Sequence, residues 1–239
     1  MPTTNPGTTN LVAWWSLDEA SGNRNDSHGV NHLTPGGLLS YATGKVGNAA
    51  DFEGSTTDYL TIADNAAMRT GDIDWTYCLW VKAETLLGVG VYAGLVSRDP
   101  QSNNREMHII YNGDVGRFFV QIFTAASTAA GRVQADSLGQ PSVGVWYFIV
   151  VWHDAGADTL CIQVNGGAVD SAAESATVGP AKAVATEFGT DVRATQGRYW
   201  DGLIDEVGFW KRKLNEREIQ WLYNGGNGRA YSETGVAPI

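Results

Sequence analysis

Short apolar segments recur along the chain and alternate with clusters of Gly, Asn and Asp. Ten of these segments have the length, and the content of Val, Ile, Thr and aromatic residues, that is typical of β-strands. They span residues 11–17, 49–52, 59–62, 75–81, 93–97, 106–111, 117–123, 146–152, 159–164 and 202–210. Many short strands separated by turn residues indicate a sandwich or a barrel, so the pattern predicts an all-β fold.

The alternation of side chains assigns residues to faces, because successive residues of a strand point to opposite sides of a sheet. Segments 117–123 and 146–152 are apolar on both faces, so at least one sheet must be covered on both sides. The alternation places four large aromatic residues on one shared outer face: Trp80, Phe119, Phe148 and Trp152. Long loops, a ligand groove or a partner subunit could cover this face, and the sequence does not choose among them.

One helix is indicated near the C-terminal end, in segment 214–226. Asn215 can cap the helix, and Glu218 three residues later completes a capping box. Apolar residues recur at helical spacing after the cap, and Gly225 with Gly226 ends the helix. We expect a short helix that packs on the sandwich.

The chain of 239 residues is long for an average domain but within the range of a single β-sandwich. Residues 1–10 and 231–239 carry no periodic pattern, so we expect an N-terminal arm, a folded body over 11–230 and a C-terminal tail. The two cysteines, Cys78 and Cys161, are too few for a disulfide framework and lie inside strand-like segments. We expect both to be buried thiols.

The chain carries 16 Lys and Arg against 26 Asp and Glu, which gives a formal net charge of -10. Such a charge repels phosphate backbones and anionic lipid surfaces, so we expect no nucleic-acid partner. No apolar run reaches the length of a membrane span, and the first residues lack the basic and apolar regions of a signal peptide. We therefore expect no membrane insertion, while divalent cations and neutral ligands such as sugars stay compatible with the charge.

Four segments in chain order carry a family resemblance: LVAWWSLDEASGNRNDSHGVNHL, WTYCLWVK, VGVWYFIVVWHDAGADTLCIQVNGG and RYWDGLIDEVGFWKRKLNEREIQWLYNGG. Together they resemble the concanavalin A-like lectin and glucanase superfamily, and specifically its laminin G-like branch. They lie within residues 11–228, so the resemblance covers the folded body. It implies an antiparallel jelly-roll sandwich of two sheets, frequently a bound calcium ion, and a ligand site on the concave sheet or its rim loops.

The hydrolase branch of this superfamily places two Glu and one Asp at alternate positions of one strand, because cleavage needs an acid and a nucleophile beside the same sugar bond. This array is missing from the sequence. Asp72 and Asp74 precede a strand, while Asp205 and Glu206 are adjacent, so we expect the latter two on opposite faces. The sequence therefore predicts no catalytic residues and no enzyme, and a glycoside hydrolase is the less favoured alternative.

The acidic loop after the first segment offers oxygen ligands of the kind that calcium prefers. The candidate metal ligands in this loop are Asp18, Asn25, Asp26 and Asn31. By the resemblance, Asp205 of the closing strand reaches the same place, because the first and last strands pair in this fold. The alternative is that these residues form turns and accept hydrogen bonds from the backbone.

Candidate ligand-binding residues lie in the polar segment 97–106 and on the expected outer face. Sugar recognition combines an aromatic platform with planar or charged hydrogen-bonding groups. The candidates are Trp80, Arg98, Asp99, Asn104, Arg105, His108, Gln121 and Trp152. The alternative is a solvated loop beside aromatic residues that the chain itself or a neighbouring subunit buries.

These observations favour a lectin-like carbohydrate-binding or adhesion module, stabilised by calcium and acting outside a cell or on a phage particle. Its partner would be a glycan or a cell-surface polysaccharide. The alternative is a virion decoration or tail-associated structural protein. Such a protein would contact copies of itself or other virion proteins through the apolar outer face.

Overall fold

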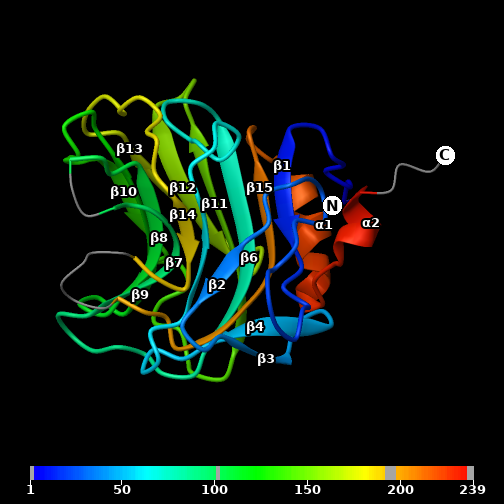
Figure 1. Cartoon of the computed structure of the whole chain (residues 1–239). Coiled ribbons are helices and arrows are strands. Elements are labelled where there is room, and N and C mark those ends of the chain that lie inside the picture. Colours follow the sequence, from blue (N-terminus) through cyan, green and yellow to red (C-terminus); the bar gives the residue numbers. More distant parts are fainter. Residues whose placement is uncertain (1–2, 101–102, 192–197, 236–239) are drawn as a thin grey trace.

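The computed structural model describes residues 3–100, 103–191 and 198–235. These residues form two antiparallel sheets that face each other, with the helices on the outer side of one sheet (Figure 1). The predicted all-β jelly-roll sandwich with a short C-terminal helix is therefore confirmed.

The two sheets contain eight and seven strands. The eight-stranded sheet consists of β1 (Leu11–Trp15), β3 (Ser40–Thr43), β4 (Asn48–Phe52), β6 (Trp75–Ala83), β11 (Trp146–Asp154), β12 (Thr159–Val164), β13 (Val169–Ala173) and β15 (Gly202–Trp210). The seven-stranded sheet consists of β2 (Thr34–Gly36), β5 (Tyr59–Ile62), β7 (Tyr92–Arg98), β8 (Met107–Asn112), β9 (Arg117–Phe123), β10 (Ala129–Gln134) and β14 (Thr186–Phe188). The helices are α1 (Glu216–Tyr223), the short 3-10 helix η1 (Asn224–Gly226) and α2 (Tyr231–Gly235).

The strand order shows how distant segments meet. It runs β13-β12-β11-β6-β15-β4-β3 in the first sheet and β10-β9-β8-β7-β14-β5-β2 in the second. In addition, β1 pairs with β15, so the first and last strands are neighbours, as the resemblance implies. This pairing brings the acidic loop after β1 to the same side of the molecule as the closing strand.

All ten predicted segments form strands, whereas β2, β3, β10, β13 and β14 were not predicted. Four of these five strands lie at the edges of the two sheets. An edge strand has one neighbour only and buries less side-chain surface, so it needs no marked apolar pattern. The sequences of β10 (AAGRVQ) and β13 (VDSAA) illustrate this.

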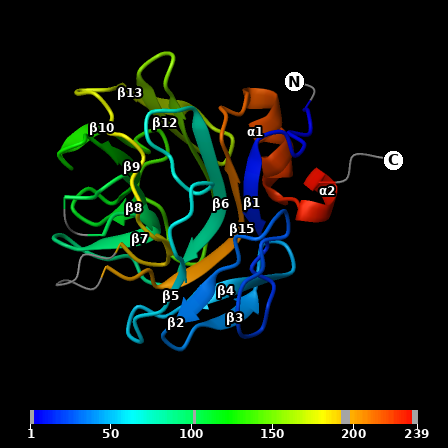
Figure 2. The same ribbon diagram turned by 45° about the horizontal axis from the view of Figure 1, so that its top comes forward.

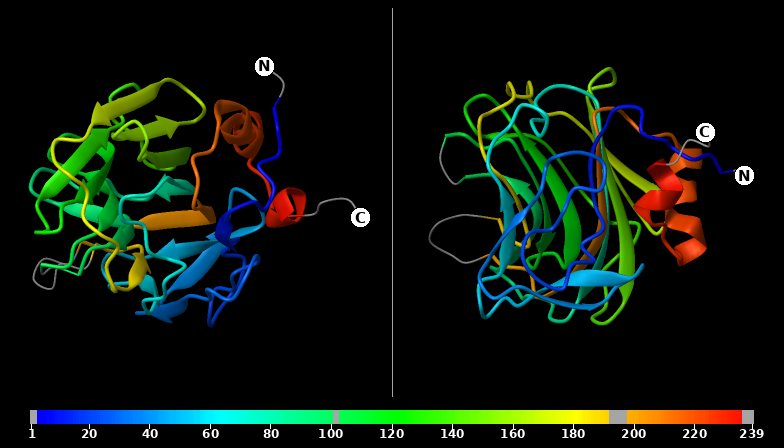
Figure 3. Two further views of the ribbon diagram at one scale, coloured as in Figure 1. Left: turned by 90° about the horizontal axis from the view of Figure 1, so that it is seen from above. Right: turned by 45° about the vertical axis from the view of Figure 1, so that its right-hand side comes forward.

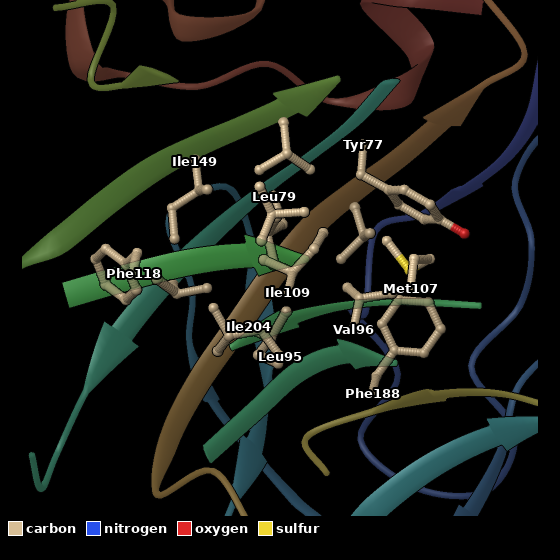
Figure 4. Close-up of a cluster of buried hydrophobic side chains, with 14 of the residues drawn as sticks. Tyr77, Leu79, Leu95, Val96, Met107, Ile109, Phe118, Ile149, Phe188 and Ile204 are labelled. Carbon is tan, nitrogen blue, oxygen red and sulfur yellow. The ribbon is translucent and has the colours of Figure 1, made fainter. Parts of the chain in front are cut away.

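Side chains from both sheets fill the space between them (Figure 4). Tyr77 and Leu79 of β6 point into this core, as the alternation predicts, and are fully buried. The ring of Tyr77 stacks on that of Phe209, with centroids 4.2 Å apart. Ile109 and Phe118 enter the same core from the seven-stranded sheet. Burying each large apolar side chain stabilises the fold by about 1.5 to 3 kcal/mol, so this core fixes which face of each strand points outward.

The outer face of the eight-stranded sheet is also apolar and buried. Trp80 and Trp152 project onto it from β6 and β11, and they share an apolar cluster with Ile219 and Leu222 of α1. Figure 2 shows α1 lying along β1 and β15 on this side of the sheet. The helix begins after Asn215 with the predicted capping box, so the prediction of a packing helix is confirmed.

The expectation that four aromatic residues share this face is wrong for Phe119. This residue lies on β9 in the other sheet, because alternation within a strand does not tell which sheet the strand joins. Trp80, Phe148 and Trp152 do share the face, and the chain's own helix covers them. The two other covers considered for these residues, a ligand groove and a partner subunit, are therefore wrong.

Residues 3–10 of the N-terminal arm and residues 231–235 of the C-terminal tail both lie on the side of the molecule that carries the helices (Figure 3). The backbone N–H of Thr4 donates a hydrogen bond of 3.1 Å to the carbonyl of Arg217 in α1. Part of the expected tail forms α2, and the ring of Tyr231 lies 6.3 Å from that of Trp14. Residues 231–235 of the expected tail are therefore helical, although their sequence carries no periodic pattern.

Two smaller expectations concern the cysteines and the membrane. Cys78 in β6 and Cys161 in β12 are both buried and free, as their positions in strand-like segments predict. Among the described residues, no helix is long and apolar enough to cross a lipid bilayer.

Candidate functional site

A row of polar side chains crosses five strands on the outer face of the seven-stranded sheet. The strand register pairs Glu187 with Ser97, Ser97 with His108, His108 with Gln121, and Gln121 with Arg132. Their neighbours along the strands, such as Ile109 and Val120, belong to the core. Because successive residues point to opposite sides, these five side chains point away from the core, and we call them the polar row.

His108 lies at the centre of the polar row and is only 2% exposed. Its Nδ1 atom lies 3.2 Å from Oδ2 of Asp99 and 3.7 Å from Oδ2 of Asp191. Within the described part of the chain, Nε2 of His108 has no hydrogen-bond partner although it is buried. One ring nitrogen is thus held by carboxylates, and the other is available to a ligand.

Two arginines hold these carboxylates in place. Arg105 donates to Asp99 at 2.6 Å, and Arg198 donates to Asp191 at 3.0 Å. Each guanidinium also lies over an aromatic ring, with Arg105 3.9 Å from the centroid of Phe123 and Arg198 4.4 Å from that of Tyr92. Charge-assisted hydrogen bonds and ring contacts together fix the cluster around His108.

The electrostatics of this cluster favour a polar or anionic ligand over a metal ion. Asp99, His108 and Asp191 offer ligand atoms within 4.8 Å of one another, but the carboxylates already accept from guanidinium groups that a cation would have to displace. Burial by itself favours neutral imidazole, yet Asp191 and Asp99 outweigh burial and raise the pKa of His108 above its ordinary value.

The two ends of the polar row differ in charge. At the β14 end, burial raises the pKa of Glu187 to about 7, and the nearby Asp191 adds to this shift. At the β10 end, Arg132 is exposed, and its guanidinium lies 5.4 Å from the ring centroid of Phe119. Arg132 takes part in no ion pair within the described ranges. The β10 end therefore carries the unpaired positive charge.

Two adjoining cavities lie beside the polar row. The first has a volume of about 150 Å³ and is lined by Tyr92, His108, Ile110, Asn112, Phe119, Gln121, Arg132 and Arg198. The second has a volume of about 310 Å³ and is lined by Phe119, Arg132, Val133, Gln134, Asp136, Asp170, Ser171 and Ala172. Phe119 and Arg132 line both cavities, so the two cavities are neighbours and these two side chains lie at the border between them.

The structure brings four of the predicted ligand-binding residues together. Asp99, Arg105, His108 and Gln121 lie on or beside the polar row. The signals that found them were the polar segment after β7 and the outward parity of two strands. We therefore take the outer face of the seven-stranded sheet as the candidate ligand site.

The other four predicted ligand-binding residues lie elsewhere. The side chain of Arg98 is fully buried and pairs with Glu106 at 3.1 Å. Asn104 is exposed in the loop between β7 and β8. Trp80 and Trp152 are buried beneath α1 on the opposite sheet.

Several residues of the site were not predicted from the sequence. They are Tyr92, Phe119 as a cavity residue, Arg132, Glu187, Asp191 and Arg198. Arg132 lies in the unpredicted edge strand β10, whose register shift between Ala129 and Gly131 interrupts the alternation, so the pattern gave no signal for it. Asp191 and Arg198 follow β14 in a segment without a periodic pattern, so nothing in the sequence connects them to His108.

The predicted metal ligands do not form one cluster. Oδ1 of Asp26 accepts hydrogen bonds from the backbone N–H groups of Trp14 at 3.0 Å and His28 at 2.9 Å, and Oδ2 accepts from that of Asn31 at 3.0 Å. Asn25 is exposed and bonds to Glu19. Asp26 and Asn31 thus match the alternative of a turn held by backbone hydrogen bonds.

Asp18 and Asp205 hold a different segment, the turn over residues 44–48. Oδ1 of Asp18 accepts from the backbone N–H of Asn48 at 2.7 Å, while Oδ2 of Asp205 accepts from those of Lys45 at 2.6 Å and Val46 at 3.0 Å. The set of five predicted ligands is therefore split over separate places.

Glu206 joins Asp205 on the outer face, which corrects the expectation of opposite faces. The pairing of β15 with β6 shifts register between Asp205 and Gly208, and Glu206 has a φ of 46°, as in a β-bulge. As a result Asp205 lies beside Trp80, and Glu206 accepts a hydrogen bond from Nε1 of Trp14. The extra residue of the bulge turns both carboxyl groups to the same side.

Two carboxyl oxygens at this bulge are of the kind that a hard cation binds. Oδ1 of Asp205 and Oε1 of Glu206 are buried and have no hydrogen-bond partner among the residues described. Burial raises the pKa of Asp205 to about 8 and that of Glu206 to about 9, with the charge of Asp18 contributing to both shifts. Calcium prefers carboxylate oxygens, so Asp205 and Glu206 each offer one buried candidate ligand atom. Together with Asp18 they are not among the described groups of three whose ligand atoms lie within 4.8 Å of one another.

The family comparison agrees with this architecture. A laminin G-like model of the concanavalin A-like lectin/glucanases superfamily matches residues 53–220. The match covers more than half of the chain, and the protein therefore belongs to this superfamily. No curated protein matches the sequence at a significant level.

Solved structures share the fold at low sequence identity. The binding domain of Paraclostridial Mosquitocidal Protein 1 superposes with a TM-score of 0.72 at 14% identity, covering 91% of this chain and 52% of that chain. Domain 4 of AbnA, a GH43 extracellular arabinanase from Geobacillus stearothermophilus solved in complex with arabinotriose, gives 0.63 at 19% identity, covering 92% and 98%. The binding domain of Botulinum Neurotoxin DC in complex with SialylT gives 0.69 at 11% identity, covering 91% and 52%.

These similarities establish the fold. The chain spans about half the length of the two toxin binding domains and nearly all of the arabinanase domain. The three neighbours are described as two binding domains and one domain of a glycoside hydrolase, which sets the context for a proposal about function.

Proposed function

We propose that this protein is a lectin-like carbohydrate-binding module whose ligand site is the outer face of the seven-stranded sheet. The observation that carries the proposal is the polar row beside a cavity, with the buried Nε2 of His108 left without a partner. Amide, imidazole and guanidinium groups next to aromatic rings are the chemistry that sugars require. The neighbours solved with arabinotriose and with SialylT support this proposal.

The proposed activity is binding without hydrolysis. Glycosidases need one protonated and one free carboxylate beside the same bond. On the polar row, Glu187 is the carboxyl group with a raised pKa, while Asp191 is bonded to Arg198 and His108. Burial would raise the pKa of Asp191, but His108 and Arg198 outweigh it and lower the pKa, so Asp191 is engaged in ion pairs. We expect no release of reducing ends from β-glucans, arabinans or galactans.

The proposed setting is outside a cell, on a cell surface or a phage particle. Helix α1 covers the apolar face on which the alternative of a virion structural protein depended. No feature of the described residues now favours that alternative. The proposed partner is therefore a glycan or a cell-surface polysaccharide.

We further propose that calcium stabilises the fold through Asp18, Asp205 and Glu206. The support is the pair of buried carboxyl oxygens without partners at the β15 bulge. Burial favours the protonated, neutral form of these carboxyl groups. A divalent ion would take the place of the protons and balance the negative charge of the carboxylates. This site lies on the opposite sheet from the polar row, so its role would be structural.

A glycan array probed with the purified chain, with and without calcium, tests the proposed function. We expect binding to a defined group of glycans, and at least about tenfold weaker binding for Gln121→Ala, the equivalent of one lost hydrogen bond. Gln220→Ala on α1 is the matched control and should bind like the wild type. Binding that survives Gln121→Ala and His108→Ala unchanged would place the site elsewhere.

A further inference from the structure

The cavity beside the polar row has a positively charged wall. Arg132 and Arg198 line it together with His108, and none of the eight described residues that line it carries a carboxylate. The whole chain has a formal net charge of -10. A wall of this sign is therefore a local departure from the composition of the chain.

Arg132 supplies a positive charge that no carboxylate of the described residues pairs with. Arg198 is paired with Asp191 at 3.0 Å, whereas Arg132 has no ion pair in the parts of the chain described. Its guanidinium lies over the ring of Phe119, which orients the side chain at the border of the two cavities. An anionic group could therefore bind Arg132 without displacing an existing partner.

His108 supplies a second donor in the same cavity. Asp99 and Asp191 lie at Nδ1, and they favour the protonated ring, in which both nitrogens donate hydrogen bonds. Nε2 is buried without a partner. A buried donor left unpaired destabilises the folded protein, and a ligand oxygen at this atom would offset that cost.

We propose that this cavity binds an acidic sugar unit through its carboxylate, which pairs with Arg132 and accepts a hydrogen bond from Nε2 of His108. This inference rests on the proposed function, because it specifies which glycan the site accepts. The planar guanidinium fork matches the two oxygens of a carboxylate. A neutral sugar would leave Arg132 without a partner of opposite charge.

The adjoining cavity indicates which sugar unit can follow the acidic one. Its lining includes Asp136 and Asp170, and Asp170 accepts hydrogen bonds from Ser137 at 2.8 and 2.9 Å. A second acidic unit there would meet like charges, which disfavour binding. The preferred ligand is therefore an acidic unit followed by a neutral one.

The charges around His108 also predict how binding depends on pH. Asp99, Asp191, Arg105 and Arg198 surround the ring, and the polar row adds Glu187 and Arg132. As pH rises through about 7, Glu187 gains a negative charge. The pKa of His108 is raised because Asp191 and Asp99 outweigh its burial, so this ring loses its proton at a higher pH than an ordinary histidine. Both changes weaken the attraction for an acidic sugar, so its affinity should fall as pH rises.

Calorimetric titrations with sialyllactose, sulfated lactose and lactose test the proposal. All three sugars contain lactose: sialyllactose adds a carboxylate, sulfated lactose adds a sulfate, and lactose itself carries no acidic group. We expect wild-type protein to bind sialyllactose at least about tenfold more tightly than lactose, and Arg132→Gln to remove this preference. Arg217→Gln, an exposed charge on α1, is the matched control and should keep it.

The outcomes separate this inference from the proposed function. Equal affinity for sialyllactose and lactose, or an unchanged preference in Arg132→Gln, would overturn the acidic-sugar assignment. Equal affinity for sulfated lactose would overturn the assignment of a carboxylate. If lactose binds as tightly as sialyllactose and Gln121→Ala abolishes both, the proposed function holds without this inference. If no glycan on the array binds either, the proposed function fails as well.

Discussion

The outer faces of both sheets carry large aromatic side chains, but different groups cover these side chains on each sheet. On the eight-stranded sheet, Trp80 and Trp152 are sealed by the apolar side of α1. On the seven-stranded sheet, the outward rings of Phe119 and Phe123 are covered by guanidinium groups instead. An arginine covers an aromatic ring with its flat face and still presents hydrogen-bond donors to a ligand.

This difference shows how one fold can separate stability from recognition. A helix makes an outer face part of the core, because its apolar side chains pack on that face and exclude water from it. Arginines shield the rings while the surface between them keeps its cavities and its charge. We therefore expect substitutions on the helix-covered face to change stability, and those on the polar row to change binding.

The largest effect is expected on the face that α1 covers. Trp152→Ala removes a side chain that is 7% exposed, and it should lower the free energy of unfolding by about 3 to 5 kcal/mol. Urea denaturation measures this loss, and Gln121→Ala on the polar row should change stability by about 0.5 kcal/mol or less. If Trp152→Ala kept full stability and lost glycan binding, the assignment of the two faces would be reversed.

The next largest effect concerns the carboxyl groups at the bulge in β15. An ion bound by the folded state alone stabilises it by about 2.7 kcal/mol at a hundredfold excess over its dissociation constant, so calcium should raise the melting temperature and chelator should lower it. Asp205→Asn and Glu206→Gln should remove this response, whereas Asp26→Asn should keep it. A melting temperature insensitive to millimolar calcium and to chelator would exclude the ion.

The sequence predicted much of the fold because alternation and turn chemistry are local. The strands, the capping box of α1 and the inward face of β6 all follow from patterns within a few residues. Alternation could not assign Phe119 and Phe148 to different sheets, because that choice depends on the strand order. Edge strands such as β10 form because they pair with a neighbouring strand, although their sequences show little alternation of apolar and polar residues.

The candidate sites depended even more on contacts between distant segments. His108 and Gln121 were predicted because their outward direction follows from strand parity. Asp191 reaches His108 from a segment more than eighty residues away, and no spacing rule connects them. Glu206 was excluded because adjacent residues normally point to opposite faces, and its bulge is visible only in the structure.

A smaller effect is expected at the start of the helix that covers the first face. Oδ1 of Asn215 accepts from the backbone N–H groups of Arg217 at 3.0 Å and Glu218 at 3.2 Å. Asn215→Ala should lower the free energy of unfolding by about 1 kcal/mol. Hydrogen exchange should become faster in α1 and stay unchanged in β8 and β9. Equal acceleration in both sheets would show that α1 does not act as a local cover.

The smallest effect is expected from a carboxyl group on the open face. Burial raises the pKa of Glu187 to about 7 in the folded state, above the ordinary value that it has in the unfolded chain. The folded state therefore binds the proton more tightly, so Glu187 contributes stability that is fully present below its unfolded pKa and is lost as pH rises through about 7.

Because Glu187 is partly solvated, we expect its contribution to change by less than about 1 kcal/mol between pH 5 and pH 8. Denaturation of the wild type and of Glu187→Gln, both in saturating calcium, measures the contribution of Glu187. The difference between the two free energies of unfolding removes the effects of the other titrating groups, because both proteins contain them. The wild type should lose more stability than Glu187→Gln over this interval. Parallel pH profiles would mean that Glu187 is as well solvated in the folded chain as in the unfolded one, and the polar row would then be more open to water than its burial indicates.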